Sequence, residues 1–138
     1  MGERTTCTPI TEYLYVGGVE ATIPDECLFG VGLGEDRSGE RRWVRYVYVP
    51  LEDRDDEADF SSAIPIILSI IDAAREAKSV AYVHCTHGMS RSPSACVAYL
   101  VLRVGMSFSD ARDLVCSLRK YSLVRPGYQR AILSTSPM

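Results

Sequence analysis

Long hydrophobic runs are missing from this chain of 138 residues. Its longest mostly apolar run, Ala63 to Ile71, is far shorter than the roughly 20 residues that a membrane-spanning helix needs. No charged start followed by an apolar stretch suggests a secretory signal. The segment Met1–Thr6 fits the loose myristoylation pattern, but the acidic residue directly after Gly2 makes lipidation there unfavourable. We therefore expect no stable association with membranes.

A large excess of one charge and a regular cysteine pattern are missing as well. The net charge at pH 7 is −3, which gives no reason to expect a nucleic-acid or acidic-membrane partner. The five cysteines are odd in number and scattered, so they form no disulfide framework, and we expect a reduced compartment, cytoplasmic or also nuclear. His84, Cys85 and His87 lack a distant fourth ligand, so we expect no metal.

The chain has no internal repeat, low-complexity tract or composition break that would mark a linker. Its hydrophobic fraction of 46% and charged fraction of 24% are typical of a globular protein. Its length suits one domain with one core. We expect a flexible lead-in over residues 1–9, a single domain over residues 10–138, and a monomer.

Apolar residues recur with strand and helix periods, and this predicts an alternation of the two. Strands are expected over residues 10–16, 43–49 and 80–83, and helices over residues 94–103, ended by Gly105, and from the capping box at Ser107 to about residue 120. Strands alternating with helices indicate an α/β fold with a mostly parallel central sheet flanked by helices.

Two segments are harder to assign. A helix should begin between Ser61 and Pro65 and end near Ala77, because proline is tolerated only in the first turn, and the acidic segment 52–59 before it should be a solvated loop. The secondary structure of the glycine-rich segment Leu28–Gly34 cannot be assigned from the sequence. It superficially suggests a dinucleotide-binding loop, but no helix follows it.

The run His84-Cys85-Thr86-His87-Gly88-Met89-Ser90-Arg91-Ser92 lies between an expected strand and an expected helix. Such a loop is a natural anion site, because the first helical amides have no internal partners and the helix dipole is positive there. That field favours a thiolate at Cys85. If the loop curls back, the Arg91 guanidinium can take two phosphate oxygens while backbone amides take the others, and Gly88 permits the necessary conformation. The predicted phosphate-binding residues are Thr86, His87, Gly88, Met89, Ser90 and Arg91.

This His-Cys-x5-Arg-Ser run resembles the signature of the protein tyrosine phosphatase superfamily, and this version is similar to its dual-specificity branch. The segments Ile10–Gly17, Val49–Asp53 and Arg125–Gln129 resemble the opening strand, acid loop and closing segment of that family. The resemblance spans roughly residues 10–133 and departs from the pattern over residues 21–42, where the usual helix and strand are shortened. It implies a small atypical dual-specificity phosphatase: a phosphatase-II-like single domain with a shortened N-terminal region and no cofactor.

Cleaving a phosphate ester needs an acid to protonate the leaving oxygen. The resemblance implies an aspartate upstream of the cysteine, at a distance that Asp53 matches. Asp53 also directly follows the Val-Pro-Leu-Glu run, while Asp55 and Asp56 are its rivals.

The resemblance implies a reaction through a cysteinyl-phosphate, in which Cys85 attacks, Arg91 holds the phosphate oxygens, and Asp53 acts first as acid and then as base. It also implies that the Ser92 hydroxyl stabilises the departing thiolate, although Ser92 can equally be the N-cap of the helix. We expect His84 to orient the loop from within the fold. His87 either touches substrate at the pocket rim or is merely exposed.

The expected substrate is a phosphoprotein carrying phosphotyrosine or phosphoserine/threonine, because the resemblance and the short chain imply a shallow site. Phosphoinositides are disfavoured, since Thr86, His87 and Met89 are neutral and the nearby run is acidic. The competing hypothesis is a phosphopeptide-binding pseudophosphatase. Against it, Cys85, Asp53 and the arginine of the signature are all intact.

Overall fold

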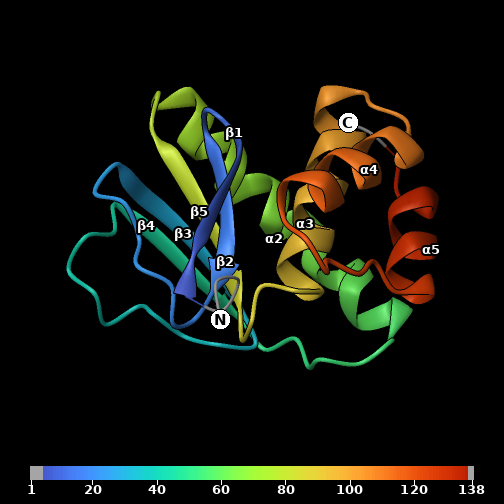
Figure 1. Ribbon diagram of the computed structural model, residues 1–138, viewed down its shortest axis with the longest axis horizontal. Helices are drawn as coiled ribbons and strands as arrows, with labels where there is room; N and C mark the ends of the chain where they lie inside the picture. The colour runs from blue at the N-terminus through green and yellow to red at the C-terminus, as the bar shows by residue number, and fades with distance from the viewer. Residues whose placement is uncertain (1–4, 137–138) are drawn as a thin grey trace.

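The computed structural model describes residues 5–136, so Gly2 lies outside the described residues. Its centre is a five-stranded sheet (Figure 1). The strands are β1 (Cys7–Thr11), β2 (Leu14–Gly18), β3 (Cys27–Leu33), β4 (Arg45–Val49) and β5 (Val80–Cys85), in the spatial order β1-β2-β5-β3-β4. β1 pairs antiparallel with β2, and every other pair is parallel. The predicted α/β fold with a mostly parallel sheet is confirmed.

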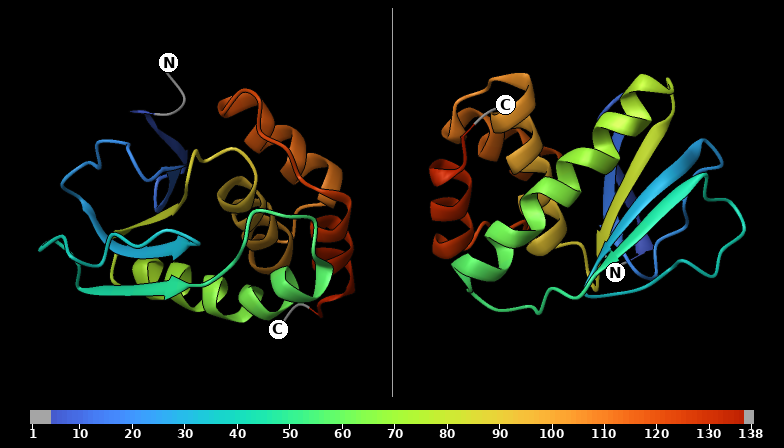
Figure 2. Two further views of the ribbon diagram at one scale, coloured as in Figure 1. Left: turned by 90° about the horizontal axis from the view of Figure 1, so that it is seen from below. Right: turned by 180° about the vertical axis from the view of Figure 1, so that it is seen from behind.

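The helices of the described residues all lie on one face of this sheet (Figures 1 and 2). They are α2 (Glu57–Glu76), α3 (Arg91–Tyr99), α4 (Phe108–Leu118) and α5 (Pro126–Ser134), and α3 continues into a short π-helical segment, η1 (Leu100–Val104). None of the helices over residues 5–136 is long and apolar enough to span a bilayer.

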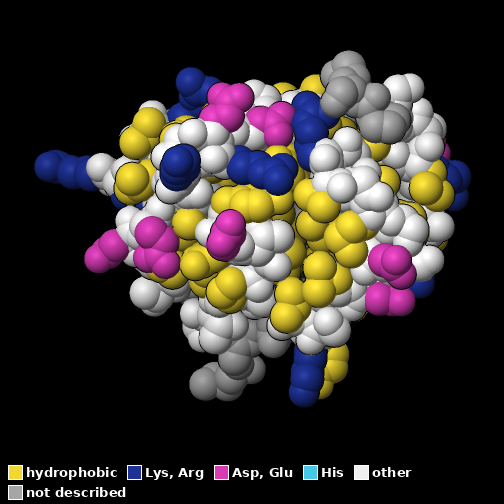
Figure 3. Space-filling model, turned by 90° about the horizontal axis from the view of Figure 1, so that it is seen from above, with side chains coloured by type: hydrophobic (Ala, Val, Ile, Leu, Met, Phe, Trp, Pro, Cys, Tyr) yellow, Lys and Arg dark blue, Asp and Glu magenta, His cyan; other side chains and the backbone are white. Residues whose placement is uncertain are grey.

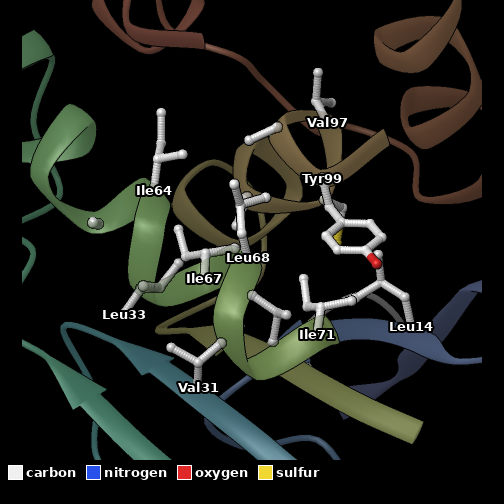
Figure 4. Packing of buried hydrophobic residues seen from close by; sticks show 14 of the residues in the cluster. Leu14, Val31, Leu33, Ile64, Ile67, Leu68, Ile71, Val97 and Tyr99 are labelled. Atoms are coloured by element: carbon white, nitrogen blue, oxygen red, sulfur yellow. The ribbon is translucent and has the colours of Figure 1, made fainter. Parts of the chain in front are cut away.

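The main core lies between the sheet and the first two helices. Figure 4 shows the strand residues Leu14 and Val31 on the side of Ile67 and Ile71 of α2, with the ring of Tyr99 of α3 close to Leu14, and all five are completely buried. Burying an aliphatic side chain of this size contributes about 1.5–3 kcal/mol. This packing fixes β5 and α3, the two elements that flank the cysteine motif.

The other face of the sheet is covered by loops. Over the described residues, segments 19–26 and 34–44 carry no helix there, which agrees with the shortened helix expected over residues 21–42. The expected shortening of the strand in that region is wrong, because β3 has seven residues and is longer than the other four strands of the sheet. The two loops are joined by a hydrogen bond from Arg37 Nη1 to the Ala21 carbonyl at 2.8 Å. They enclose a second, smaller hydrophobic cluster around Tyr82.

The open segment Leu28–Gly34 is mostly strand β3. Gly30 in this strand is explained by the aromatic side chains that lie across it. A Cβ on Gly30 would meet the Trp43 ring at 2.6 Å and the Tyr46 ring at 2.8 Å. The glycine-rich run therefore makes room for aromatic cover and forms no nucleotide-binding loop.

The longest helix begins earlier than the sequence predicts. α2 begins at Glu57, because the carboxylate of Asp56 caps it by accepting a hydrogen bond from a first-turn amide at 3.0 Å. Pro65 therefore lies inside the helix, where it removes the amide that would bond the Ser61 carbonyl. Both residues are exposed, so water can replace that amide. The expected solvated loop over residues 52–59 is correspondingly shorter.

Other boundaries differ more modestly. The single strand predicted over residues 10–16 is wrong: a turn at Glu12 and Tyr13 divides it into β1 and β2, and β1 already begins within the expected lead-in of residues 1–9. β4 begins slightly later than predicted, and α3 begins earlier, at Arg91. The predicted end at Gly105 and the capping of α4 by Ser107 are confirmed.

Candidate active site

The cysteine motif connects the end of the central strand β5 to the beginning of α3. Cys85 and Arg91 are 2% and 5% exposed, although both line a pocket of about 200 Å³ at this end of the sheet. Its other lining residues are Asp53, His87, Met89, Ser90, Tyr121, Leu123 and Arg125. The fold thus brings the predicted nucleophile, arginine and acid to one pocket, although Asp53 lies far from Cys85 in the sequence.

The guanidinium of Arg91 is fixed on two sides. Its Nη1 donates to the Leu51 carbonyl at 2.8 Å, and its Nη2 donates to Thr86 Oγ1 at 2.9 Å. Thr86 Oγ1 in turn donates to Glu35 Oε2 at 2.8 Å, so the Thr86 side chain supports the arginine. A Cβ at Gly34, whose φ is 81°, would overlap Arg91 Nη1, which explains the glycine there.

One edge of the same guanidinium is still available. Arg91 Nε is buried and makes no hydrogen bond to the described residues, and it lies 3.9 Å from Asp53 Oδ1. A buried donor without a partner is costly. Nε and the second hydrogen of Nη2 form a fork that can hold two oxygens of an anion in the pocket.

A second arginine, which the sequence analysis missed, holds the loop from behind. Arg119 is completely buried at the end of α4. Its Nε donates to the Gly88 carbonyl at 2.7 Å, and its Nη2 donates to the His87 carbonyl at 3.1 Å. Its Nη1 reaches Thr8 Oγ1 at 2.8 Å. These two carbonyls are directed at Arg119 and are therefore turned away from an anion in the pocket, as an anion cradle requires.

Gly88 permits this arrangement in two ways. Its φ is 69°, in the left-handed region that favours glycine. A Cβ there would also lie 2.5 Å from the Gly17 carbonyl carbon and 2.7 Å from Arg119 Nη2. Any larger residue would separate the loop from both supports.

Ser92 lies beneath the cysteine. Its Oγ is 3.2 Å from Cys85 Sγ, where either atom can be the donor, and it can also donate to the Gly17 carbonyl at 3.2 Å. The alternative interpretation of Ser92 as the N-cap is wrong, because Ser90 occupies that position and Ser92 is inside the first turn of α3. The Ser92 hydroxyl can therefore donate either to the Gly17 carbonyl or to the Cys85 sulfur.

His84 is completely buried behind the loop. Its ring lies against the rings of Tyr46 and Tyr82, with centroid distances of 5.9 and 5.6 Å, and its Nε2 is 2.7 Å from the Tyr46 hydroxyl. Burial, together with the positive charge of Arg37, lowers the pKa of His84 to about 4. The imidazole is therefore neutral at physiological pH. His87, by contrast, is exposed at the pocket rim.

The three aspartates of the acid loop have different partners. Asp53 faces the pocket, where its Oδ1 accepts a hydrogen bond from Arg125 Nη2 at 2.9 Å. Asp55 Oδ1 accepts one from the Gly127 amide at 2.7 Å, and Asp56 caps α2. The two rivals of Asp53 are thus engaged in structural hydrogen bonds.

The beginning of α5 makes a further contact with the acid loop and two with the first turns of α2. The Tyr128 hydroxyl donates to the Arg54 carbonyl at 2.8 Å, and Arg130 Nε donates to Glu57 Oε1 at 2.9 Å. The Tyr128 ring also stacks on Phe60 of α2, with a centroid distance of 4.4 Å. The closing segment that resembles the phosphatase family therefore contacts the loop that carries Asp53.

A larger hollow of about 500 Å³ lies at the opposite end of the sheet, on the face seen in Figure 3. It is lined by Glu12, Tyr13, Arg75, Lys78 and Ser79. Arg75 covers the Tyr13 ring at 4.7 Å from its centroid. This hollow contains no cysteine or histidine, and its charged side chains are exposed. Of the two, the smaller pocket at Cys85 is therefore the candidate active site, because a nucleophile lines it.

Comparison with known proteins points in the same direction. The family model "Dual specificity phosphatase, catalytic domain" matches residues 34–136. The chain is 37% identical over 83 residues to dual specificity protein phosphatase 7 of Homo sapiens, covering 60% of this chain and 19% of that protein. It is 39% identical over 83 residues to dual specificity protein phosphatase 1B of Arabidopsis thaliana, covering 60% and 49%. The chain thus spans between about a fifth and half of the length of these curated relatives.

Solved structures extend the likeness to nearly the whole chain. The crystal structure of a variant of human DUSP28 is 25% identical and has a TM-score of 0.79, with 92% of this chain and 91% of that chain covered. The human tyrosine phosphatase-like serine/threonine/tyrosine-interacting protein has a TM-score of 0.77 at 17% identity, with 92% and 93% covered, and shows the fold alone.

Proposed function

Because this chain belongs to the dual-specificity phosphatase family, we propose that it hydrolyses phosphotyrosine and phosphoserine/threonine in proteins through a cysteinyl-phosphate intermediate. The observation that carries the proposal is the convergence on one pocket of Cys85, Asp53 and the Nε of Arg91, which makes no hydrogen bond to the described residues. An anion held by Arg91 there lies next to the sulfur and within reach of a carboxyl group, which is the arrangement that phosphate transfer to a thiolate needs.

In the first step the Cys85 thiolate attacks phosphorus and the ester oxygen leaves. Arg91 Nε and Nη2, with the loop amides, hold the non-bridging oxygens and stabilise the charge of the transition state. Protonated Asp53 gives its proton to the leaving oxygen. The products are a free hydroxyl group on the protein substrate and a phosphorylated Cys85.

In the second step Asp53, now a carboxylate, takes a proton from water, and the resulting nucleophile attacks phosphorus. The sulfur–phosphorus bond breaks and the electron pair returns to Cys85. The position of Ser92 Oγ at 3.2 Å from the sulfur supports a hydrogen bond to this departing thiolate. A hydroxyl that turns from the Gly17 carbonyl to the sulfur supplies it without moving the backbone.

The decisive experiment is turnover of an aryl phosphate by wild type, Cys85→Ser and Asp53→Asn. We expect no measurable turnover for Cys85→Ser and a loss of about 10²- to 10⁴-fold for Asp53→Asn. Asp55→Asn is the matched control, because Asp55 bonds α5, and it should lose much less. Trapping of ³²P-phosphate on wild type but not on Cys85→Ser identifies the intermediate.

Two results would refute the proposal. An inactive wild type that still binds phosphopeptides would establish a pseudophosphatase instead. Turnover of soluble phosphoinositides in clear preference to phosphopeptides would move the substrate to lipids.

A further inference from the structure

One side of the pocket mouth is apolar. Met89, Tyr121 and Leu123 line the pocket that contains Cys85, and we call these three residues the apolar wall. Tyr121 is 80% exposed and Leu123 is 55% exposed, so their side chains are largely open to solvent at the entrance. Adjacent exposed apolar side chains at a pocket are typical of a binding surface.

The segment that carries the apolar wall is attached to the catalytic loop. The Leu123 amide donates to the Met89 carbonyl at 2.7 Å, and the Ser122 hydroxyl donates to the Arg119 carbonyl at 2.7 Å. Between them Tyr121 has a φ of 67°, in the left-handed region that is unfavourable for a tyrosine. Backbone strain of this kind concentrates at functional sites. Here it directs a large aromatic side chain to the pocket entrance.

The rest of the pocket is charged. Arg91 provides the phosphate site at the floor, and Asp53 and Arg125 occupy the mouth. A substrate whose phosphate is on Arg91 must therefore place whatever follows the ester oxygen beside the apolar wall or beside the Asp53–Arg125 ion pair. In phosphotyrosine a complete aromatic ring follows, whereas in phosphoserine or phosphothreonine only one or two carbons separate the oxygen from the backbone.

We propose that the apolar wall holds the aromatic ring of phosphotyrosine, and that this protein therefore prefers phosphotyrosine to phosphothreonine and phosphoserine. The inference rests on the proposed function. The rings of Tyr121 and phosphotyrosine meet at the entrance, and Leu123 and Met89 cover the ring nearer the phosphate. Tyr121 and Leu123 are specificity-determining residues, because the short side chains of the other phosphoresidues place no ring against them.

The test compares two peptides of identical sequence that carry either phosphotyrosine or phosphothreonine at one position. For Tyr121→Gly and for Leu123→Ala, kcat/KM for the phosphotyrosine peptide should fall about three- to tenfold, mainly through KM. The phosphothreonine peptide should change less than about twofold by the same reasoning. Glycine accepts the positive φ at position 121, so this variant removes the ring without straining the fold. Tyr121→Phe should keep the preference.

Leu133→Ala is the matched control, because Leu133 is 58% exposed on α5 and does not line the pocket. An equal loss on both peptides, or no loss on either, would overturn the inference while leaving the phosphatase function intact. A wild type inactive on an aryl phosphate and on both peptides would instead remove the proposed function, and the inference with it.

Discussion

The two loops that meet at the pocket are held in different ways. The catalytic loop, residues 84–92, lies mostly in the interior and is bound from behind by the buried guanidinium of Arg119. The acid loop, residues 50–56, is mostly exposed, and its carboxylate Asp53 is 52% exposed beside Arg125. Buried charge-assisted hydrogen bonds are costly to break, whereas exposed ion pairs contribute at most about 1 kcal/mol.

This difference distinguishes the groups proposed to bind and attack the phosphate from the group proposed to transfer the proton. The position of the proposed nucleophile, Cys85, and of the proposed phosphate cradle is part of the folded core, so it should change only when the fold is damaged. The position of the acid depends on contacts with the beginning of α5, which surface substitutions and salt can weaken. The proton-transfer step is therefore the one that can be tuned without loss of the fold.

The largest effect should come from Arg119→Met. This change leaves the buried Gly88 carbonyl and the part-buried His87 carbonyl without their donor, at a cost of about 1–3 kcal/mol for a buried unsatisfied group. We expect the free energy of unfolding, measured with urea, to fall by about 3–5 kcal/mol, as for other broken buried charge networks. For the fraction that remains folded, kcat/KM should fall about 10²-fold, because the loop carbonyls can turn toward the phosphate.

Arg112→Met is the matched control, since Arg112 lies on the same helix, α4, and its side chain is 44% exposed. It should change the stability and the activity little. An Arg119→Met protein with normal kcat/KM would show that the catalytic loop keeps its shape unaided, and the contrast between the loops would disappear.

The next effect is a pH dependence of stability that belongs to His84. Burial lowers its pKa to about 4 in the folded protein, from an ordinary value of 6.5. Between these values the unfolded chain binds a proton that the folded protein does not. The stability from the neutral imidazole is therefore complete above about pH 6.5 and is lost as the pH falls toward 4, by up to about 3 kcal/mol.

Urea unfolding at pH 7 and pH 5 measures this contribution. Between these values the wild type should lose about 2 kcal/mol more than His84→Asn, which has no proton to gain. The only other histidine of the chain, His87, is exposed, so His87→Asn should keep the pH dependence of the wild type. Equal slopes for wild type and His84→Asn would refute the assignment.

The residues of the catalytic loop could be predicted from the sequence, whereas Arg119, which holds that loop from behind, could not. All the groups that define its chemistry are in one contiguous run, and a strand and a helix on either side of that run can be recognised from their periods. Arg119, at the end of α4, binds a side chain of β1 and a backbone carbonyl of the catalytic loop. Only the fold brings these segments together. In the sequence, Arg119 is simply a basic residue near the end of an exposed-looking helix.

Proline and glycine positions were weaker guides than the cysteine motif. Proline usually marks the first turn of a helix, yet Pro65 lies well inside α2, because Asp56 caps that helix earlier. The sequence leaves the glycine-rich segment Leu28–Gly34 unassigned, and the structure shows that Gly30 makes room for Trp43 and Tyr46. The role of Gly30 cannot be obtained from propensity, since Trp43 and Tyr46 are not its neighbours in the sequence. The start of α2, in contrast, depends on a local cap, which the position of Pro65 concealed.

A smaller effect should come from Gly127→Ala in α5. Alanine is the better helix former, by up to about 1 kcal/mol, so helix propensity alone predicts stabilisation. However, a Cβ at this position would lie 2.5 Å from Asp55 Oδ1 and 3.2 Å from the Glu57 amide nitrogen, so the acid loop must move. We expect no gain in stability and a fall in kcat of about tenfold, because small displacements of a catalytic group are costly.

Gly39→Ala is the control for this change, since no atom lies within 4 Å of a Cβ there. It should leave kcat unaltered. Faster or unchanged turnover by Gly127→Ala would show that the contact with α5 does not position Asp53.

The smallest effect should come from Arg125→Gln, which removes the direct partner of Asp53 but leaves the backbone contacts of the acid loop in place. Because the pair is partly exposed, we expect kcat to fall only about two- to fivefold, and high salt to reduce the difference from wild type. Arg130→Gln breaks a similarly exposed pair with Glu57 away from the pocket and should have no such salt-dependent effect. A loss for Arg125→Gln as large as that for Asp53→Asn would mean that Arg125 contacts the phosphate itself. Substitutions on the exposed side of the site would then reduce activity as strongly as those on the buried side.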